Sequence, residues 1–342
     1  MSDSYPILVN VTIAPKARLF ERYRWCDYVE LRCLTHMDKR FSRDNLAEAV
    51  GESKDLSDGW GDQNPDPDEL AMDEDEAEVP AADPEGVDAN ELLSVATFKH
   101  LRWRAQIFGA AWPFEIDEHA QEIRIKGTLN NVHYLYLQLL LSSLLQYCPK
   151  TRSATFTGTF ENLSFYIFKE LMPKAAHVYQ FGVAHSKHYT GHLFDRLQKL
   201  TKDVRGNLLL TKQDFPKNDA GDGGLDLVAW HDLEDERDNI PIAFAQCGCT
   251  VSGWPNKMLE ASPAKLGKKL ITGHDWAAYY FMPLDLCDAR DGKMHWMEWR
   301  DVNSTIVIDR LRLIRMADAD DLDTKRVLSK DAVNEALAYK LS

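Results

Sequence analysis

The chain has 342 residues, of which 44% are hydrophobic and 27% are charged, and its formal net charge is −14. This length and composition exclude a small disulfide-stapled scaffold and are typical of a globular protein with one or two domains. The longest apolar run, residues 134–145, contains Gln138 and two serines and is too short to span a bilayer, so we expect no membrane association. Six cysteines without a framework spacing, and an N-terminus without a signal-peptide pattern, predict reduced thiols in a cytoplasmic protein.

The negative charge is concentrated in one segment of the chain. Residues 52–91 contain sixteen Asp or Glu and a single basic residue, Lys54, which leaves the remainder close to neutral. The segment has too few large apolar residues to offset the entropy cost of ordering. We therefore interpret residues 50–91 as an acidic linker or insert, whose order is left open. Two alternatives remain, because such a segment can also cover a basic DNA-binding groove or dock a basic partner.

The predicted elements change in character near residue 186. Residues 1–49 form an N-terminal segment with a strand over 7–13, and residues 92–185 form a mainly helical region. In that region we expect helices over 92–108, 130–147 and 160–171, and a short strand over 122–126. Next come a helix over 191–201, strands over 208–210, 225–230 and 240–246, a helix over 257–270 interrupted near Pro263, and strands over 276–282 and 305–308. A C-terminal helical tail follows over 317–342.

A Gly-rich turn followed by two apolar strands carries the main candidate site. The sequence GDGG at residues 221–224 leads through Leu225 to Asp226, and Gln246 closes the next strand. Antiparallel strands bring these two positions together, so their oxygens can meet around one hard cation. An unpaired carboxylate in an apolar strand is costly, which favours a functional role for Asp226. Asp222 is more simply explained as a turn former.

The order of helix, three strands, helix and strand over residues 186–316 resembles the core of the PD-(D/E)xK, or restriction-endonuclease-like, nuclease superfamily. Three motifs carry the resemblance. The stretch GHLFD, ending in Asp195, is similar to the Gly-x-x-Phe-Glu that opens the first core helix in many members. Asp226 stands at the family's metal-binding Asp, and Gln246 stands at the acid or glutamine of the next strand. The resemblance implies an α/β fold with a restriction-endonuclease-like core and a mainly helical N-terminal half.

The resemblance also implies a chemistry and a set of roles. Asp195 and Asp226 would ligate Mg²⁺ or Mn²⁺ together with the backbone carbonyl of Cys247, and Gln246 would take part in catalysis. The chief departure is Gly248, which stands where the family has a lysine. Lys257 is our candidate to replace that lysine from the next helix. Three further lysines are fallbacks and candidate nucleic-acid contacts: Lys265, Lys268 and Lys269.

These expectations combine into one leading function and one alternative. The leading function is a divalent-metal-dependent endonuclease that hydrolyses DNA. By analogy it would be the effector subunit of a bacterial anti-phage defence complex, with an ATPase or helicase as partner protein. The alternative is a non-catalytic nuclease-like subunit that binds DNA or an ATPase partner, which the missing lysine favours. A scaffold without a metal is a third, weaker interpretation.

Overall fold

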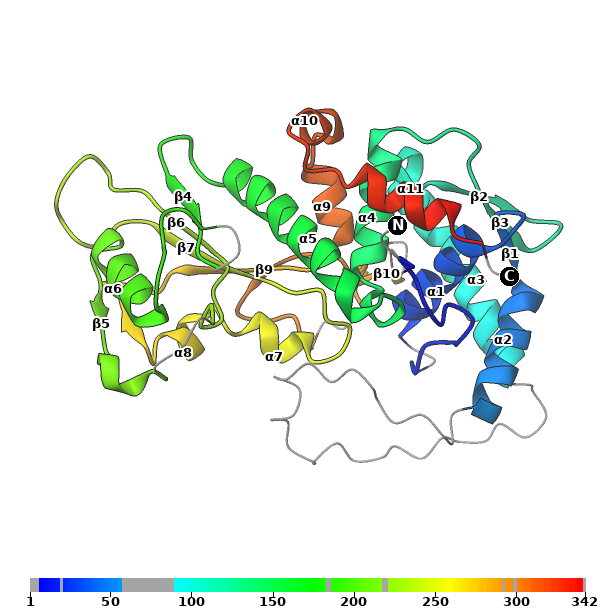
Figure 1. Ribbon diagram of the computed structural model, residues 1–342, viewed down its shortest axis with the longest axis horizontal. Coiled ribbons are helices and arrows are strands. Elements are labelled where there is room, and N and C mark those ends of the chain that lie inside the picture. Colours follow the sequence, from blue (N-terminus) through cyan, green and yellow to red (C-terminus); the bar gives the residue numbers. More distant parts are fainter. Residues whose placement is uncertain are drawn as a thin grey trace, which may run out of the picture. The chain divides into compact units, whose positions relative to one another are not determined.

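The computed structural model describes residues 6–18, 21–56, 89–182, 186–216, 221–290, 293–297 and 300–340. The chain divides into two compact units (Figure 1). The first comprises residues 1–153 and 330–342, and the second comprises residues 154–329. The sequence placed the start of the core at residue 186, whereas the compact unit starts at Ala154. Most of the acidic segment, residues 57–88, lies outside the described residues, and so does the prediction made for it.

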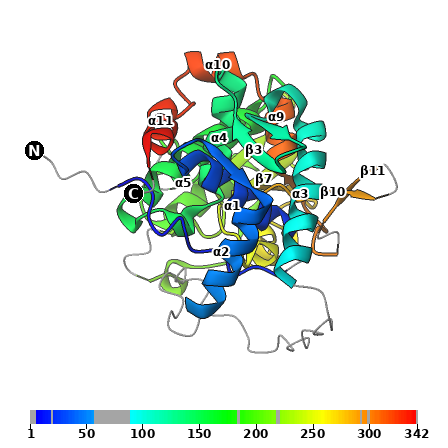
Figure 2. The ribbon, with the colours of Figure 1, turned by 90° about the vertical axis from the view of Figure 1, so that its right-hand side faces the viewer.

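The first unit is a group of helices with a small antiparallel sheet (Figure 2). The sheet has the strand order β1-β3-β2, with β1 paired to β3 and β3 to β2. Its helices are α1 (Arg22–Thr35), α2 (Arg43–Leu56), α3 (Ala89–Phe108), α4 (Asn131–Ser142) and α11 (Lys330–Ala338), and its strands are β1 (Arg40–Ser42), β2 (Phe114–Asp117) and β3 (Glu122–Ile125). The helices predicted over 92–108 and 130–147 and the strand over 122–126 are thus confirmed in type.

The strand predicted over residues 7–13 is wrong. These residues form a turn and irregular backbone, in which the Val9 amide donates to the Tyr147 carbonyl at 2.8 Å. Ile7, Leu8 and Val11 are buried, so the apolar residues enter the core without a partner strand. In this segment the partial alternation of apolar residues reflects their burial, and the segment does not pair as a β-strand.

A buried ion pair ties α1 to α3 within the first unit. Arg104 is fully buried and donates to Asp27 at 2.8 Å and to Glu30 at 3.0 Å. Glu30 also accepts from the Trp112 indole and from the Tyr136 hydroxyl. The two carboxylates thus share the charge of Arg104 and are hydrogen-bonded, which lowers the cost of burying them.

The second unit is organised around a five-stranded mixed sheet with the order β12-β9-β7-β6-β4. The pairs β4–β6 and β6–β7 are antiparallel, and the pairs β7–β9 and β9–β12 are parallel. Their bounds are β4 (His177–Gln180), β6 (Leu227–Trp230), β7 (Ile242–Cys247), β9 (Ala277–Phe281) and β12 (Ile306–Ile308). The strand predicted over 208–210 does not belong to this sheet. It corresponds to β5 (Asn207–Leu208), which pairs with β8 (Leu270–Ile271) in a separate two-stranded sheet.

Helices pack against both faces of the five-stranded sheet. On one face, Phe168 of α5 (Lys150–Leu171) lies edge-on against Tyr279 and Phe281 of β9. On the other face, α6 (Leu193–Asp203) and α8 (Pro263–Leu266) share a core with the apolar side chains of β6 and β7. The helix predicted over 257–270 is divided, as its proline indicated, into α7 (Trp254–Met258) and α8.

When α6, β5 and β8 are left out, the chain passes through α5, β4, β6, β7, α7 with α8, and β9. This is a helix, three antiparallel strands, a helical segment and a strand that returns parallel to the third. The order predicted from residue 191 onward is wrong in its first two elements, because β4, preceded by α5, is the neighbour of β6 in the sheet. Helix α6, which was assigned the first place, instead lies in the connection between β4 and β6.

The other C-terminal elements of the second unit lie outside the five-stranded sheet. Strands β10 (Cys287–Arg290) and β11 (Lys293–Trp296) form an antiparallel pair (Figure 2), and α9 (Arg310–Met316) and α10 (Ala319–Thr324) follow β12. Among the residues described in either unit, no helix combines the length and apolar character that a bilayer crossing requires.

We expect Arg104→Leu to destabilise the first unit by about 3–5 kcal/mol, because it leaves two carboxylates buried without a counter-charge. Arg102→Leu on the same helix is the matched control. Its pair with Glu118 is partly exposed, and we expect a loss of about 1 kcal/mol or less. Urea unfolding of both variants measures the difference, and equal losses would contradict a stabilising role for the buried pair.

Candidate functional site

Asp226 lies where three strands of the second unit meet. Its amide donates to the Ala245 carbonyl of β7 at 3.0 Å, and its carbonyl accepts from the Phe181 amide, directly after β4, at 2.6 Å. Its carboxylate oxygen Oδ2 accepts from the Cys247 amide at 2.7 Å. Asp226 is thus held by backbone contacts to both neighbouring strands, and the ladder places it beside the end of β7, where Gln246 lies.

The Asp226 carboxyl is buried among other acids. Burial raises its pKa, and the charges of Asp222 and Glu161 raise the pKa further. The Cys247 amide and the charge of Lys257 oppose this shift in part. The side chain is only 7% exposed, so solvent does little to screen these charges. A cluster of this kind favours either a proton or a cation at Asp226.

Glu161 is the acid that the sequence analysis missed. It lies on α5, and its charge also raises the pKa of the Cys247 and Cys249 thiols at the end of β7. The helix was predicted, but nothing linked it to the site because β4 was not recognised. With β4 as the first strand of the sheet, α5 is the helix that precedes it and Glu161 becomes the acid that this helix contributes.

The Gly-rich turn is closed tightly against the helical segment after β7. Gly223 and Gly224 have φ values of +70° and +84°, and Asp222 accepts a hydrogen bond from the Gly224 amide at 2.8 Å. A Cβ atom at Gly224 would lie 2.9 Å from the Cβ of Glu260, so a side chain there would collide. Asp222 therefore forms the turn, as expected, and also acts electrostatically on Asp226.

Glu260 is a further acid that was not predicted. Burial raises its pKa and so does the charge of Asp222, whereas Lys265 and Lys257 lower it. Lys265 forms an ion pair with Glu260 at 3.5 Å, and Lys269 donates to the Gly223 carbonyl at 2.8 Å. These two lysines thus brace the Gly-rich turn.

The predicted catalytic residues are only partly brought together. Lys257 on α7 lies close enough for its charge to act on Asp226 and Glu260. Asp195 is exposed in the first turn of α6, and no interaction of the described residues links it to Asp226. Cys247 touches Asp226 through its amide, and a carbonyl ligand at Cys247 stays a prediction. Lys268 is exposed, and a contact of Lys265, Lys268 or Lys269 with nucleic acid also stays a prediction.

Two buried polar atoms beside Asp226 have no hydrogen-bond partner among the described residues. They are Oε1 of Gln246 and the hydroxyl oxygen of Tyr280. Gln246 and Tyr280 are register partners on β7 and β9, so their side chains lie on the same face of the sheet. An unsatisfied buried polar atom costs about 1–3 kcal/mol. Their presence next to a buried carboxylate points to a ligand that these oxygens would contact.

Tyr280 also explains why no lysine stands at residue 248. A Cβ atom built on Gly248 would lie 2.2 Å from the Tyr280 hydroxyl oxygen. The space into which a side chain at this position would extend is therefore filled by a buried tyrosine. A positive charge at this site has to come from another element, and Lys257 on α7 is the lysine whose charge reaches Asp226.

The donor set fits a divalent metal of the magnesium type. In the described part of the chain, no three His, Cys, Asp or Glu side chains are grouped closely enough to hold a metal ion. Mg²⁺ is commonly held by one or two carboxylates and keeps several waters. Asp226, one further acid from Glu161 or Asp222, and the Gln246 oxygen are the oxygen donors that such a metal would need, and the clustered negative charge favours a cation.

Comparison of the chain with protein-family models, with curated proteins and with solved structures finds no match. The function is therefore argued from the geometry of the site.

We expect Asp226→Asn to stabilise the metal-free protein at neutral pH by about 1 kcal/mol or more, because it removes a buried charge while keeping an oxygen for the Cys247 amide. The folded-state pKa of Asp226 is raised, so the folded state binds this proton more tightly than the unfolded state. Stability of the wild type should then fall as pH rises from about 4 through that raised pKa. Melting temperatures between pH 4 and 8 test this, and a parallel profile in the variant would contradict it.

Gly248→Ala should destabilise the second unit by about 1–3 kcal/mol, because the added methyl group overlaps the Tyr280 hydroxyl. Gly127→Ala is the matched control, since a Cβ atom there meets no atom within 4 Å. Adding Tyr280→Phe to Gly248→Ala should recover part of the loss. Equal stability of the two single variants in urea unfolding would show that the Tyr280 ring moves aside easily.

Proposed function

We propose that this chain is a divalent-metal-dependent nuclease that hydrolyses DNA phosphodiester bonds, with a core of the PD-(D/E)xK type. The observation that carries the proposal is the buried Asp226 at the junction of β4, β6 and β7, with the charges of Glu161 and Lys257 acting on it. An acid from the first helix, an Asp at the start of the second strand, a glutamine at the end of the third and a lysine together resemble that nuclease site.

The strand arrangement supports the same assignment. The family's core is a helix, three antiparallel strands, a helix and a further strand. In this chain α5, β4, β6, β7, the α7–α8 segment and β9 follow one another in that order. The chain departs from the pattern by the long connection between β4 and β6, which contains α6, and by the lysine on α7 in place of residue 248.

Each residue has a definable task in such a reaction. Asp226 and Glu161 would hold Mg²⁺ or Mn²⁺, with Gln246 contributing a neutral oxygen. The cation would polarise the scissile phosphate and lower the pKa of an attacking water. Lys257 would orient that water and stabilise the negative charge that develops on the phosphate. The Tyr280 hydroxyl, which has no other partner among the described residues, can donate a hydrogen bond to a phosphate oxygen.

The wider role is proposed from the resemblance alone. The chain would be the effector subunit of a bacterial anti-phage defence complex and would work with an ATPase or helicase. The acidic segment that joins α2 to α3 would be a docking element for such a partner, because its charge is suited to a basic surface.

A second candidate is a nuclease-like subunit that binds DNA or an ATPase partner without cutting. It is favoured by one observation, the replacement of the expected lysine by Gly248 against a buried Tyr280. The two candidates differ in whether Lys257 substitutes for that lysine. Its charge acts on Asp226, which favours the active enzyme.

Cleavage of plasmid and linear DNA with Mg²⁺ or Mn²⁺ tests the proposal. We expect wild-type protein to cut, and both Asp226→Ala and Lys257→Ala to lose on the order of 100-fold or more in rate, in keeping with the loss of charge stabilisation in the transition state. Lys174→Ala is the matched control, because Lys174 is an exposed lysine in the connection from α5 to β4. It should cut at the wild-type rate.

Metal binding has a readout that is independent of cutting. Mg²⁺ or Mn²⁺ should raise the melting temperature of the wild type but not that of Asp226→Asn. Metal-dependent stabilisation without cleavage would favour the non-catalytic subunit. Full cleavage by Asp226→Ala would overturn the nuclease site.

A further inference from the structure

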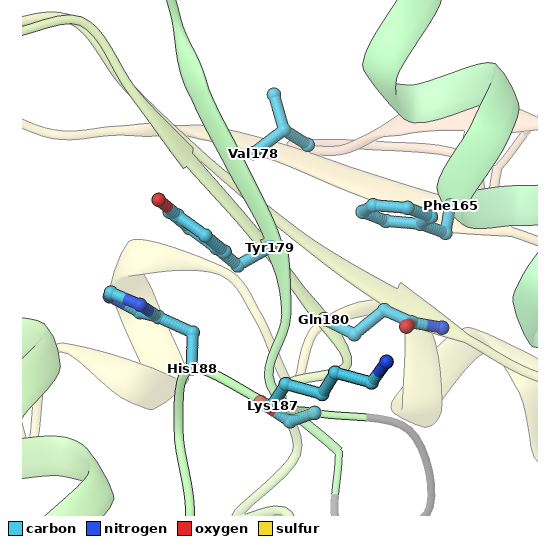
Figure 3. A pocket seen from close by; sticks show the side chains of 7 residues that line it. Phe165, Val178, Tyr179, Gln180, Lys187 and His188 are labelled. Atoms are coloured by element: carbon cyan, nitrogen blue, oxygen red, sulfur yellow. The ribbon is translucent and has the colours of Figure 1, made fainter.

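A cavity of about 440 Å³ opens at the edge strand of the sheet, next to the acid cluster. It is lined by Phe165 of α5, by residues of β4 including Gln180, and by the segment that contains Lys187 (Figure 3). Figure 3 shows Phe165, Gln180 and the ammonium end of Lys187 on one side of β4, and the rings of Tyr179 and His188 on the other. Its volume lies within the range of small-molecule sites, which is roughly 300–1,000 Å³.

Two stacked rings lie on one side of β4. Tyr179 and His188 stack with ring centroids 4.0 Å apart and an interplanar angle of 12°. Tyr179 also stacks on Trp230 of β6 at 5.4 Å. His188 contacts Asp203 at 3.1 Å, which anchors its ring to the end of α6. These contacts hold β4 in place from the side opposite Phe165 and Gln180.

The other side of the cavity offers an apolar ring and two polar groups. The Gln180 amide nitrogen donates to Asn162 at 3.1 Å, which fixes the orientation of its carboxamide. Its oxygen accepts no hydrogen bond from the described residues, and within the same described ranges Lys187 has no ion-pair partner. A flat apolar surface beside a hydrogen-bond acceptor and an ammonium group is complementary to an aromatic ring that carries amino groups and a nearby negative charge. A nucleotide has these features.

The cavity and the acid cluster share a backbone connection. Gln180 is paired with Leu227, the residue after Asp226, and the amide of the residue after Gln180 donates to the Asp226 carbonyl. A nucleotide whose phosphate lies at Asp226 would therefore have the cavity within reach of its own base or of a neighbouring base. The cavity and the Asp226 site are thus connected through the backbone of β4 and the start of β6.

We propose that this cavity takes one unpaired base of the DNA strand that the Asp226 site cuts, with the base on Phe165, the Gln180 oxygen on its amino group and Lys187 on an adjacent phosphate. This inference rests on the proposed nuclease function. A base within a duplex has its faces stacked and its Watson–Crick amino group paired, so the preferred substrate is single-stranded DNA. A duplex would have to extrude a nucleotide at a cost of a few kcal/mol.

The test uses the full-length chain and a 5′-fluorescein-labelled 12-nucleotide single strand, alone or annealed to its complement, in Ca²⁺. Fluorescence anisotropy should show tighter binding of the single strand than of the duplex. Phe165→Ala should weaken single-strand binding roughly tenfold, as expected for the loss of one base–aromatic stack. Tyr166→Ala, which removes the neighbouring ring of the same helix outside the cavity, should bind as the wild type does.

A base-specific readout separates stacking from a change in stability. Single strands that carry 2-aminopurine at successive positions should include one whose emission is quenched on binding to the wild type but not to Phe165→Ala. Lys187→Ala should reduce the salt dependence of binding by about one phosphate contact, whereas Lys174→Ala should not. If Phe165→Ala fails to fold, Phe165→Leu keeps apolar bulk without the flat ring and should show the same loss of quenching.

The outcomes distinguish the two proposals. A wild-type protein that cuts DNA in Mg²⁺, while the Phe165 and Lys187 variants bind and quench as it does, would overturn the base site and leave the nuclease standing. A wild-type protein that cuts duplex in preference to single strand would also overturn the base site. A wild-type protein that neither binds nor cuts any oligonucleotide would overturn both.

Discussion

The second unit depends on one constraint, the burial of Asp226 at the point where β4, β6 and β7 meet. Its backbone completes the hydrogen-bonding of both neighbouring strands, and its carboxylate accepts the amide that follows Gln246. These contacts hold the side chain in a largely buried position. Each other feature of the site follows from that placement: the glycines that let the turn close, the lysines that brace it, and the acids that share its field.

The sequence predicted strands β6, β7 and β9 but missed β4. Strands β6, β7 and β9 are apolar runs bounded by turn residues, so their pattern was sufficient. Strand β4 has four residues with polar ends and follows a long helix closely, so it gave no comparable signal. Taking residues 208–210 as the first strand then made α6 the opening helix and Asp195 its acid. The helix that precedes β4 is α5, and the charge of Glu161 on this helix acts on Asp226.

At residue 248, where the resemblance implies a lysine, the space is occupied by the buried Tyr280 side chain. Tyr280 fills the space beside Gly248 with a buried ring, which strengthens the core between β7 and β9 but removes room for a flexible cation. Sequence pattern could show the missing lysine, and only the three-dimensional arrangement shows why it cannot be restored there. Helix α7 begins a few residues after β7, so a lysine on its first turns is the nearest alternative source of positive charge.

The site is unfavourable for the stability of the protein without a ligand. Asp226 is buried beside the charges of two acids, and two further polar oxygens have no partner among the described residues. In the first unit, by contrast, Asp27 and Glu30 share the charge of Arg104, and their other oxygens accept hydrogen bonds from Ser143 and Tyr136. The charge at Asp226 is only partly offset, by the Cys247 amide and by the charge of Lys257. Local violations of this kind are expected where function and not folding selects the residues, because a bound cation and a phosphate would satisfy the groups that the fold leaves open.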